Sequence, residues 1–123
     1  GEFLVGEIDN RIIAMGAFRP AEGYITEFLT DLSDETAEIK RMRVDPAHQR
    51  QGHGQSIYDE LEQRARERGF GDLVLDTTPQ QVGARRFYEK NLFEDVQKER
   101  VQPGDEVFEL IFYRKSLTDA TED

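Results

Sequence analysis

Short apolar runs that alternate with charged positions predict a β-hairpin near each end of the chain. Residues 3–8 and 11–18 are two such runs, and the DN dipeptide between them consists of residue types that tolerate the positive φ of a tight turn. Residues 93–101 and 106–117 repeat the pattern on either side of the turn-forming segment QPGD. We therefore expect two antiparallel pairs of strands.

The segment AEIKRMRV, residues 37–44, alternates strictly and predicts a third strand that Asp45 and Pro46 bring to an end. The alternation assigns one face to Ala37, Ile39, Arg41 and Arg43, and the other face to Glu38, Lys40, Met42 and Val44. Residues 19–36, which precede this strand, lack any periodicity and contain Pro and Gly. They predict a long connection with one short helical turn.

Two amphipathic helices with a strand between them follow. Residues 56–68 have apolar side chains at helical spacing, Ile57, Leu61 and Ala65. Gly69 is placed to end this helix in the left-handed conformation. Residues 72–78, DLVLDTT, form a short apolar strand, which the right-handed crossover rule makes parallel to the strand before the helix. A second helix covers residues 80–91, with an apolar side that we assign to Val82, Phe87 and Leu92.

The predicted order is therefore β-β-β-α-β-α-β-β, an α/β fold. A chain of 123 residues supports one compact domain, so we expect residues 1–123 to form a single domain, with a frayed tail at residues 118–123. The chain begins with Gly1 rather than Met, which leaves open that further residues precede it.

The chain is strongly acidic, with a formal net charge of -10, and its basic residues are twelve arginines against four lysines. No basic stripe is present to neutralise phosphates, so nucleic acid is not an expected partner. The acid could attract cationic substrates or could be the solvated surface of a protein from a high-salt cytoplasm. We favour the second, a halophilic origin, because lysine is scarce. At roughly 1 M salt the Debye length is about 3 Å, so steering of a substrate would be largely screened.

Other compositional features narrow the classes further. The absence of cysteine excludes disulfides, thiolate metal sites and a cysteine nucleophile. No apolar run is long enough to cross a bilayer and the first residues do not form a signal-peptide core, so we expect a soluble, cytoplasmic protein without a membrane partner. His48 and His53 are five residues apart with only Asp45 close by, a poor ligand set, and we expect no metal.

The loop between the third strand and the first long helix is a candidate anion site. Its backbone N–H groups lack intrahelical partners, and Gly52 and Gly54 let an anion approach them. Arg50 could add a charge-assisted contact, and Gln49 could orient the loop or the ligand. The spacing alone does not match a nucleotide P-loop or G-x-G-x-x-G. A tight turn with a helix cap is the alternative reading.

The residues EIKRMRVDPAHQRQGHGQSIYDELEQRARERGFGDLVLDTT followed by GARRFYEKNLF resemble the GNAT superfamily of acyl-CoA N-acetyltransferases. The likeness covers residues 3–117 in element order and residues 38–93 in motifs. It implies acetyl-CoA as cofactor, bound in a split between the strands at residues 37–44 and 72–78. The pyrophosphate would lie on the segment Gln49, Arg50, Gln51, Gly52, His53, Gly54 and Gln55, and pantetheine would pair with the backbone of Met42 and Val44.

The sequence departs from the family pattern in three places. The family usually begins with another strand and two helices, which nothing before Phe3 can supply. Gln81 stands where many members have Asn at the start of the second helix, which puts its cofactor contact in question. The insertion at residues 24–32 is longer than usual, and we expect it to border the acceptor pocket. Arg85 opens the second helix near the expected path of the cofactor, or else belongs to a solvated helix face.

Acetyl transfer to an amine needs a neutral nucleophile and a protonated leaving thiolate. By the resemblance, Tyr88 is the proton donor; packing with its hydroxyl at the surface is the alternative. Glu38 is the candidate base, against the alternative of a solvated strand residue or a water relay. The acceptor is a small-molecule or peptide primary amine that the sequence does not identify. A non-catalytic acyl-CoA-binding or regulatory module is the other function considered, and a homodimer would cover exposed sheet edges.

Overall fold

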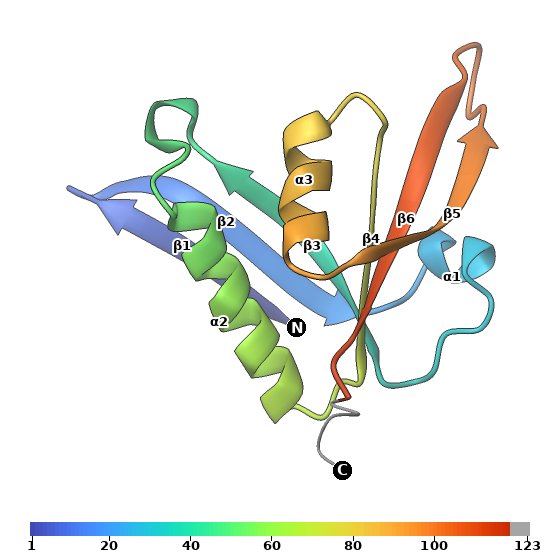
Figure 1. Cartoon of the computed structure of the whole chain (residues 1–123), viewed down its shortest axis with the longest axis horizontal. Coiled ribbons are helices and arrows are strands. Elements are labelled where there is room, and N and C mark those ends of the chain that lie inside the picture. Colours follow the sequence, from blue (N-terminus) through green and yellow to red (C-terminus); the bar gives the residue numbers. More distant parts are fainter. Residues whose placement is uncertain (119–123) are drawn as a thin grey trace.

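The computed structural model describes residues 1–118 and has the α/β architecture expected from the sequence. A single sheet has the strand order β1-β2-β3-β4-β6-β5 (Figure 1). Its strands are β1 (Glu2–Ile8), β2 (Arg11–Pro20), β3 (Thr36–Val44), β4 (Asp72–Thr77), β5 (Glu94–Val101) and β6 (Phe108–Ser116). The helices are α1 (Tyr24–Phe28), the 3-10 turn η1 (Pro46–His48), α2 (His53–Glu67) and α3 (Val82–Lys90). Apart from Thr118, the tail predicted to fray lies outside the described residues.

The predicted connections are confirmed. Strands β1 and β2 form an antiparallel hairpin in which Asp9 and Asn10 have φ of 52° and 66°, the left-handed values that a tight turn requires. Strands β5 and β6 form the second antiparallel hairpin, and β3 and β4 pair in parallel. The long connection before β3 contains the single short helix α1.

Helices cover both faces of the sheet. Neighbouring residues of a strand point to opposite faces, so Leu73 packs in the core beside α2 and α3, whereas Val74 packs in a smaller cluster beside α1. The first cluster includes Ile57 and Leu61 of α2, and the second includes Ile25 of α1. Figure 1 shows α2 and α3 side by side across the sheet. The sheet thus lies between two apolar layers.

Helix α2 begins three residues earlier than predicted, at His53 rather than Ser56. Gly52 is the N-cap with φ of 88°, a left-handed conformation that glycine adopts without strain. Gly54 lies in the first turn of the helix. A β-carbon at this position would lie 3.2 Å from Val44 Cγ2, so the missing side chain allows α2 to pack closely on β3. The predicted end is confirmed, with Gly69 at φ of 88°.

The predicted alternation along β3 is wrong beyond Lys40, because the strand contains a β-bulge. Arg41 has φ of 60°, and Arg41 and Met42 together oppose only Gly16 of β2. The extra residue reverses which face the following side chains occupy. Met42 and Val44 therefore pack against the same core cluster as Ala37 and Ile39, and Arg41 and Arg43 are exposed.

The apolar side assigned to the second helix is also partly wrong. The buried residue of α3 is Tyr88, at 8% exposure, with Ala84 and Phe87 packed beside the core. Val82 is 49% exposed and Leu92 is 74% exposed. Leu92 lies beyond the C-cap with φ of 74°, so the helix ends before its side chain can turn inward.

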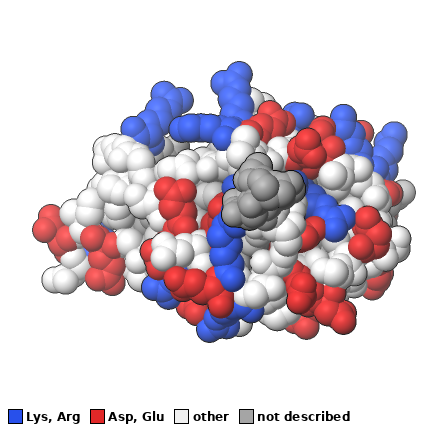
Figure 2. All heavy atoms as spheres, turned by 60° about the horizontal axis from the view of Figure 1, so that its bottom comes forward, with Lys and Arg blue, Asp and Glu red and all other residues white. Residues whose placement is uncertain are grey.

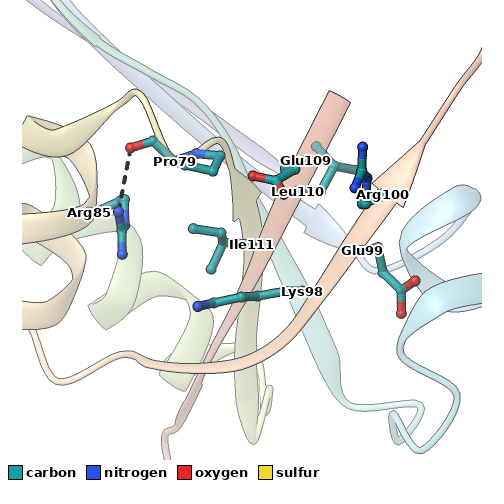
Figure 3. A pocket seen from close by; sticks show the side chains of 8 residues that line it. All are labelled: Pro79, Arg85, Lys98, Glu99, Arg100, Glu109, Leu110 and Ile111. Atoms are coloured by element: carbon teal, nitrogen blue, oxygen red, sulfur yellow. Dashed lines mark hydrogen bonds between the residues drawn. The ribbon is translucent and has the colours of Figure 1, made fainter. Parts of the chain in front are cut away.

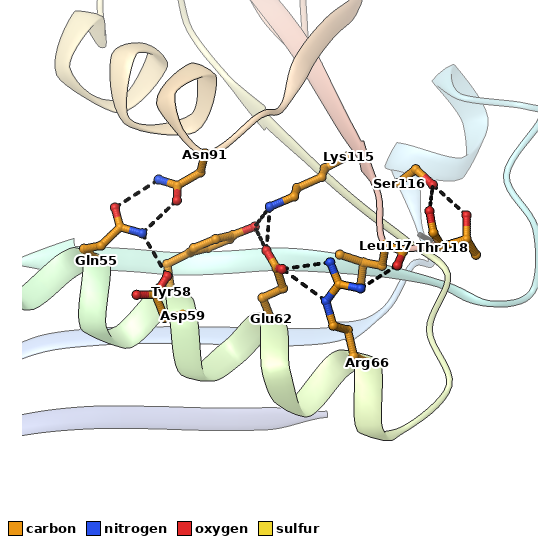
Figure 4. A network of polar contacts seen from close by, with 10 residues as sticks. All are labelled: Gln55, Tyr58, Asp59, Glu62, Arg66, Asn91, Lys115, Ser116, Leu117 and Thr118. Atoms are coloured by element: carbon orange, nitrogen blue, oxygen red, sulfur yellow. Dashed lines mark hydrogen bonds and ion pairs between the residues drawn. The ribbon is translucent and has the colours of Figure 1, made fainter. Parts of the chain in front are cut away.

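A polar network ties α2 to α3 and β6 (Figure 4). The side-chain amides of Gln55 and Asn91 bond reciprocally, with N···O distances of 2.7 and 3.2 Å. Further along α2, Glu62 accepts hydrogen bonds from Tyr58 and from Lys115 of β6, both at 2.6 Å. Half-buried charged groups are thus paired where α2 approaches β6.

No helix within residues 1–118 has the length and apolar character of a transmembrane helix.

The packing of α2 on β2 depends on the absence of a side chain at Gly16. A β-carbon there would lie 2.5–2.9 Å from Met42 Sδ, Ile57 Cγ2 and Leu61 Cδ1. We expect Gly16→Ala to lower the free energy of unfolding by about 1–3 kcal/mol, measured by urea denaturation. Gly83→Ala is the matched control: its β-carbon meets open space, so stability should stay unchanged or rise by up to about 1 kcal/mol. Equal effects of the two changes would contradict the packing argument.

Candidate active-site cleft

The parallel strands β3 and β4 separate to form a cleft. They pair only at Thr36↔Asp72, Ala37↔Leu73 and Glu38↔Val74, and beyond Glu38 the two strands part. The predicted split is therefore confirmed. A cavity of about 400 Å³ occupies it, lined by Tyr24, Glu38, Ile39, Lys40, Arg41, Met42, Arg43, Leu75, Asp76, Thr77, Gln81, Ala84 and Tyr88.

The wall on the α3 side contains Gln81 and Tyr88. Gln81 is the N-cap of α3, and its side-chain oxygen accepts a hydrogen bond of 2.7 Å from Thr77 Oγ1. The Tyr88 ring is buried and packs against Phe93 and Tyr113, and the residue also lines the cavity. Burial raises the pKa of Tyr88 to about 12, so its hydroxyl keeps its proton at any physiological pH. It can therefore donate a proton to a group in the cleft.

The wall on the α1 side contains a buried carboxylate. Glu38 is 2% exposed, so the alternative of a solvated strand residue is wrong. Its nearest cations, Arg19 and Lys40, lie at N···O distances of 3.6 and 3.7 Å. Within the described part of the chain, Glu38 Oε1 has no hydrogen-bond partner. Burial raises the pKa of Glu38, and the nearby Asp76 raises it further, against the opposing effect of Lys40 and Arg19.

Two further residues of this wall, Tyr24 and Asp76, were not among the predicted site residues. The Tyr24 hydroxyl donates a hydrogen bond to Asp76 Oδ2. Burial, followed by this bond, raises the pKa of Tyr24. The insertion at residues 24–32 does reach the cleft at Tyr24, as the sequence indicated. The indication from the sequence that Asp76 belongs to the site was weaker. It is the charged residue that follows the apolar centre of its strand, just before two threonines.

The glycine segment places several backbone amides at the start of α2. The first helical hydrogen bond runs from Ser56 N to Gly52 O. Within residues 1–118, the amides of His53, Gly54 and Gln55 donate to no backbone oxygen. A left-handed residue followed by helical ones directs successive N–H groups toward a common point. Arg50 is also left-handed, with φ of 65°. The segment thus caps α2 and leaves a group of backbone amides, here called the amide cradle, from which an anion could accept hydrogen bonds.

Side chains around the cradle are held in place by local hydrogen bonds. Gln49 Nε2 donates to the Val44 carbonyl at 3.2 Å, and His53 Nε2 lies 3.2 Å from Gln51 Oε1. The Asp45 amide donates to Ile13 of β2, so the neighbouring backbone groups of Val44, and those of Met42, face away from β2 toward the split. This edge of β3 is open to pairing by an extended ligand.

Two predicted site residues direct their side chains elsewhere. The Gln55 side chain is engaged by Asn91 and Asp59, so only its backbone belongs to the cradle. Arg85 lines a separate pocket of about 270 Å³ between α3 and the β5–β6 hairpin, near Lys98 (Figure 3). Its Nε lies 3.3 Å from the Tyr113 hydroxyl. The structure therefore does not bring the Arg85 side chain into the cleft.

A split parallel pair with an amide cradle at one end defines an acyl-CoA-binding type of α/β domain. The model of the acetyltransferase (GNAT) family matches residues 1–92, so the chain belongs to that family. No curated protein gives a significant match. The family assignment extends to acetyl transfer in general, and the acceptor is a separate question.

Solved structures support the same fold. Ribosomal-protein-S18-alanine N-acetyltransferase from Escherichia coli has 20% identity and a TM-score of 0.71, over 95% of this chain and 69% of that one. YncA from Salmonella typhimurium, solved with acetyl-CoA, has 22% identity and a TM-score of 0.76, over 95% and 65%. Ribosomal-protein-alanine N-acetyltransferase from Brucella melitensis has 19% identity and a TM-score of 0.75, over 94% and 68%. The chain thus spans about two thirds of the length of these proteins.

The buried carboxylate predicts a pH-dependent stability difference. Because the folded pKa of Glu38 is raised, its contribution to folding is complete below the unfolded value of about 4.3 and is lost as the pH rises through the folded pKa. Glu38→Gln is neutral throughout, so its free energy of unfolding should increase relative to wild type between pH 4 and pH 8 in urea denaturation. Glu106→Gln, at an exposed position of the β5–β6 turn, is the control and should show no such trend. A flat difference for Glu38→Gln would contradict the raised pKa.

Proposed function

We propose that this protein is an N-acetyltransferase that transfers the acetyl group of acetyl-CoA to a primary amine by direct attack on the thioester. The observation that carries the proposal is that one cavity is lined by both groups that the reaction needs. These are Tyr88, a buried proton donor, and Glu38, a buried carboxylate of raised pKa. The amide cradle at the start of α2 follows β3, a wall of this cleft, through the short turn η1.

Acetyl-CoA supplies the acetyl group as an activated thioester. The amides of residues 52–55 suit its pyrophosphate, and the exposed guanidinium of Arg50 suits the same charge. The open edge of β3 at Met42 and Val44 suits the amide groups of pantetheine, which pair with a strand as another strand would. Arg41 and Arg43 also line the cleft, and among the described residues neither has an ion-pair partner, so they add positive charge along this path.

The chain supplies the two proton transfers that the reaction needs. The amine nitrogen forms a bond to the acetyl carbon as the carbon–sulfur bond breaks. The proton lost by the amine passes to the Glu38 carboxylate, directly or through water, because its raised pKa makes it a better base than an exposed glutamate. The thiolate takes the Tyr88 hydroxyl proton. The products are the N-acetyl amine and free coenzyme A.

The cradle is tested by Gly52→Glu, which places a carboxylate where the pyrophosphate is expected. Calorimetric titration of coenzyme A should show micromolar binding to wild type at low and at molar KCl, and at least a tenfold loss in the variant. Gly104→Glu, in the β5–β6 turn, has the same charge change and open space around its β-carbon, and should bind like wild type. Because a left-handed residue is replaced, thermal melts must show that Gly52→Glu remains folded. Unchanged affinity in a folded variant would overturn the cradle.

The proton donor is tested by Tyr88→Phe. Turnover in a coupled thiol-release assay with a panel of amines should fall by about 10²–10⁴-fold, because the thiolate must leave unprotonated, while the affinity for coenzyme A stays constant. Tyr58→Phe removes a buried hydroxyl outside the cleft and should retain turnover. If wild type binds acetyl-CoA but turns over no amine, the alternative of a non-catalytic acyl-CoA-binding or regulatory module is favoured instead.

We further propose a cytoplasmic protein of halophilic origin, in which residues 1–123 form one domain. The net charge of -10 supports the first part, and Figure 2 shows acidic side chains in several separate groups on the face drawn. The pairing of β6 with β4 supports a domain that continues beyond the family match.

A homodimer through the β1 edge is supported by the side chains of Phe3 and Val5, which are 59% and 43% exposed. A melting temperature that does not rise in molar KCl, and a monomer in sedimentation, would contradict the halophilic origin and the dimer respectively.

A further inference from the structure

The α1 side of the cleft has an unusual concentration of oxygen atoms. Tyr24 and Asp76 are hydrogen-bonded there, and Glu38 is close enough to raise the pKa of Tyr24 by its charge. Asp76 likewise raises the pKa of Glu38. The three side chains come from α1, β4 and β3, and all line the same cavity. The fold therefore brings two carboxylates and one hydroxyl to one end of the cleft.

The positive charge at this end does not satisfy both carboxylates. In residues 1–118, no Lys or Arg lies within ion-pair distance of Asp76, and Tyr24 is its hydrogen-bond partner. Arg19 and Lys40 lie near Glu38, but beyond hydrogen-bond distance. Among the described residues, Glu38 Oε1 and Arg19 Nε are both buried without a hydrogen-bond partner. Such an arrangement costs free energy unless a ligand or water pairs with them.

We propose that the Tyr24–Asp76 pair, beside Glu38, binds the acceptor as a protonated amine, so that the acceptors are cationic amines without a neighbouring carboxylate. This inference rests on the proposed function, because it concerns the acceptor of that reaction. An ammonium group supplies an N–H donor for Glu38 Oε1 and the positive charge that Asp76 lacks. Tyr24 fixes the Asp76 carboxylate by its hydrogen bond. Glu38 takes the proton that the ammonium must lose before attack and releases it to water, so its carboxylate is free to take the second proton as the amide forms.

The same charges disfavour zwitterionic acceptors. The carboxylate of a free amino acid would lie a few ångströms from its ammonium group, and therefore close to Asp76 and Glu38. Arg41 and Arg43 also line the cavity, but they lie at and beyond the β-bulge, on the path proposed for acetyl-CoA. Of the cations nearer to Glu38, Arg19 does not line the cavity, and Lys40 faces Glu38. A like charge left unpaired in a partly buried site weakens binding strongly. Alkyl diamines, aminosugars and lysine side chains fit this end of the cleft, whereas free α-amino acids do not.

The test compares 1,4-diaminobutane with 4-aminobutanoate, which has a carboxylate in place of the second amine. Each is titrated by calorimetry into the protein saturated with coenzyme A. Wild type should bind the diamine at least tenfold more tightly than the amino acid. Asp76→Asn should remove most of this preference by weakening diamine binding about tenfold. Asp105→Asn, an exposed aspartate in the β5–β6 turn, has the same charge change and should bind both compounds as wild type does.

The outcomes separate this inference from the proposed function. Diamine binding that depends on Asp76, without acetyl transfer to any amine, supports the ammonium site and overturns catalysis. Acetyl transfer with equal use of both compounds, or with no effect of Asp76→Asn, supports catalysis and overturns the ammonium site. An absence of measurable diamine binding to the wild-type coenzyme A complex overturns the ammonium site as well. Titration of coenzyme A into Asp76→Asn confirms that the cofactor end of the cleft is intact.

Discussion

The β-bulge at Arg41 is the constraint on which the active-site cleft depends. One extra residue in β3 bends the strand and increases its local twist, while the pairing with β2 continues on the other side. The pairing of β3 with β4 ends at Glu38, three residues before the bulge. The same bulge turns Met42 and Val44 toward α2, so the core beside the helix remains closed although the sheet is open. A single left-handed residue thus reconciles a continuous core with an interrupted sheet.

The burial of Glu38 lowers the stability of the fold. A buried carboxylate whose two cations lie within ion-pair distance but beyond hydrogen-bond distance, and which has one unpartnered oxygen, is a poor choice for stability. An apolar residue at this position could pack beside Val74, its partner in β4, which lies in the apolar cluster next to α1. The unpaired oxygen is consistent with a group kept ready for a ligand, since buried polar atoms are normally satisfied within the protein. Packing and pairing do not account for a glutamate in this place, whereas the proposed proton transfer would.

Much of the fold could be predicted from local patterns, because hairpin turns, glycine helix ends and the right-handed crossover are short-range rules. The DN turn, the Gly69 helix end and the parallel pairing of β3 with β4 are examples. The bulge could not be predicted, since AEIKRMRV alternates without a break and a positive φ at Arg41 depends on its tertiary contacts. Tyr24 and Asp76 escaped prediction for a related reason: they are 52 residues apart in the chain and meet only through the folded sheet.

The reciprocal amide pair between Gln55 and Asn91 has a different consequence. It joins the first turn of α2, where the cradle lies, to the last turn of α3, whose side chains line the cleft. Both partners are uncharged, so neither dissolved ions nor protons compete for the link as they do for Glu62 and Lys115. The hydrogen bonds between the two helices should therefore be equally stable at low and at high salt. The position of the amide cradle relative to Tyr88 should thereby be independent of the salt concentration.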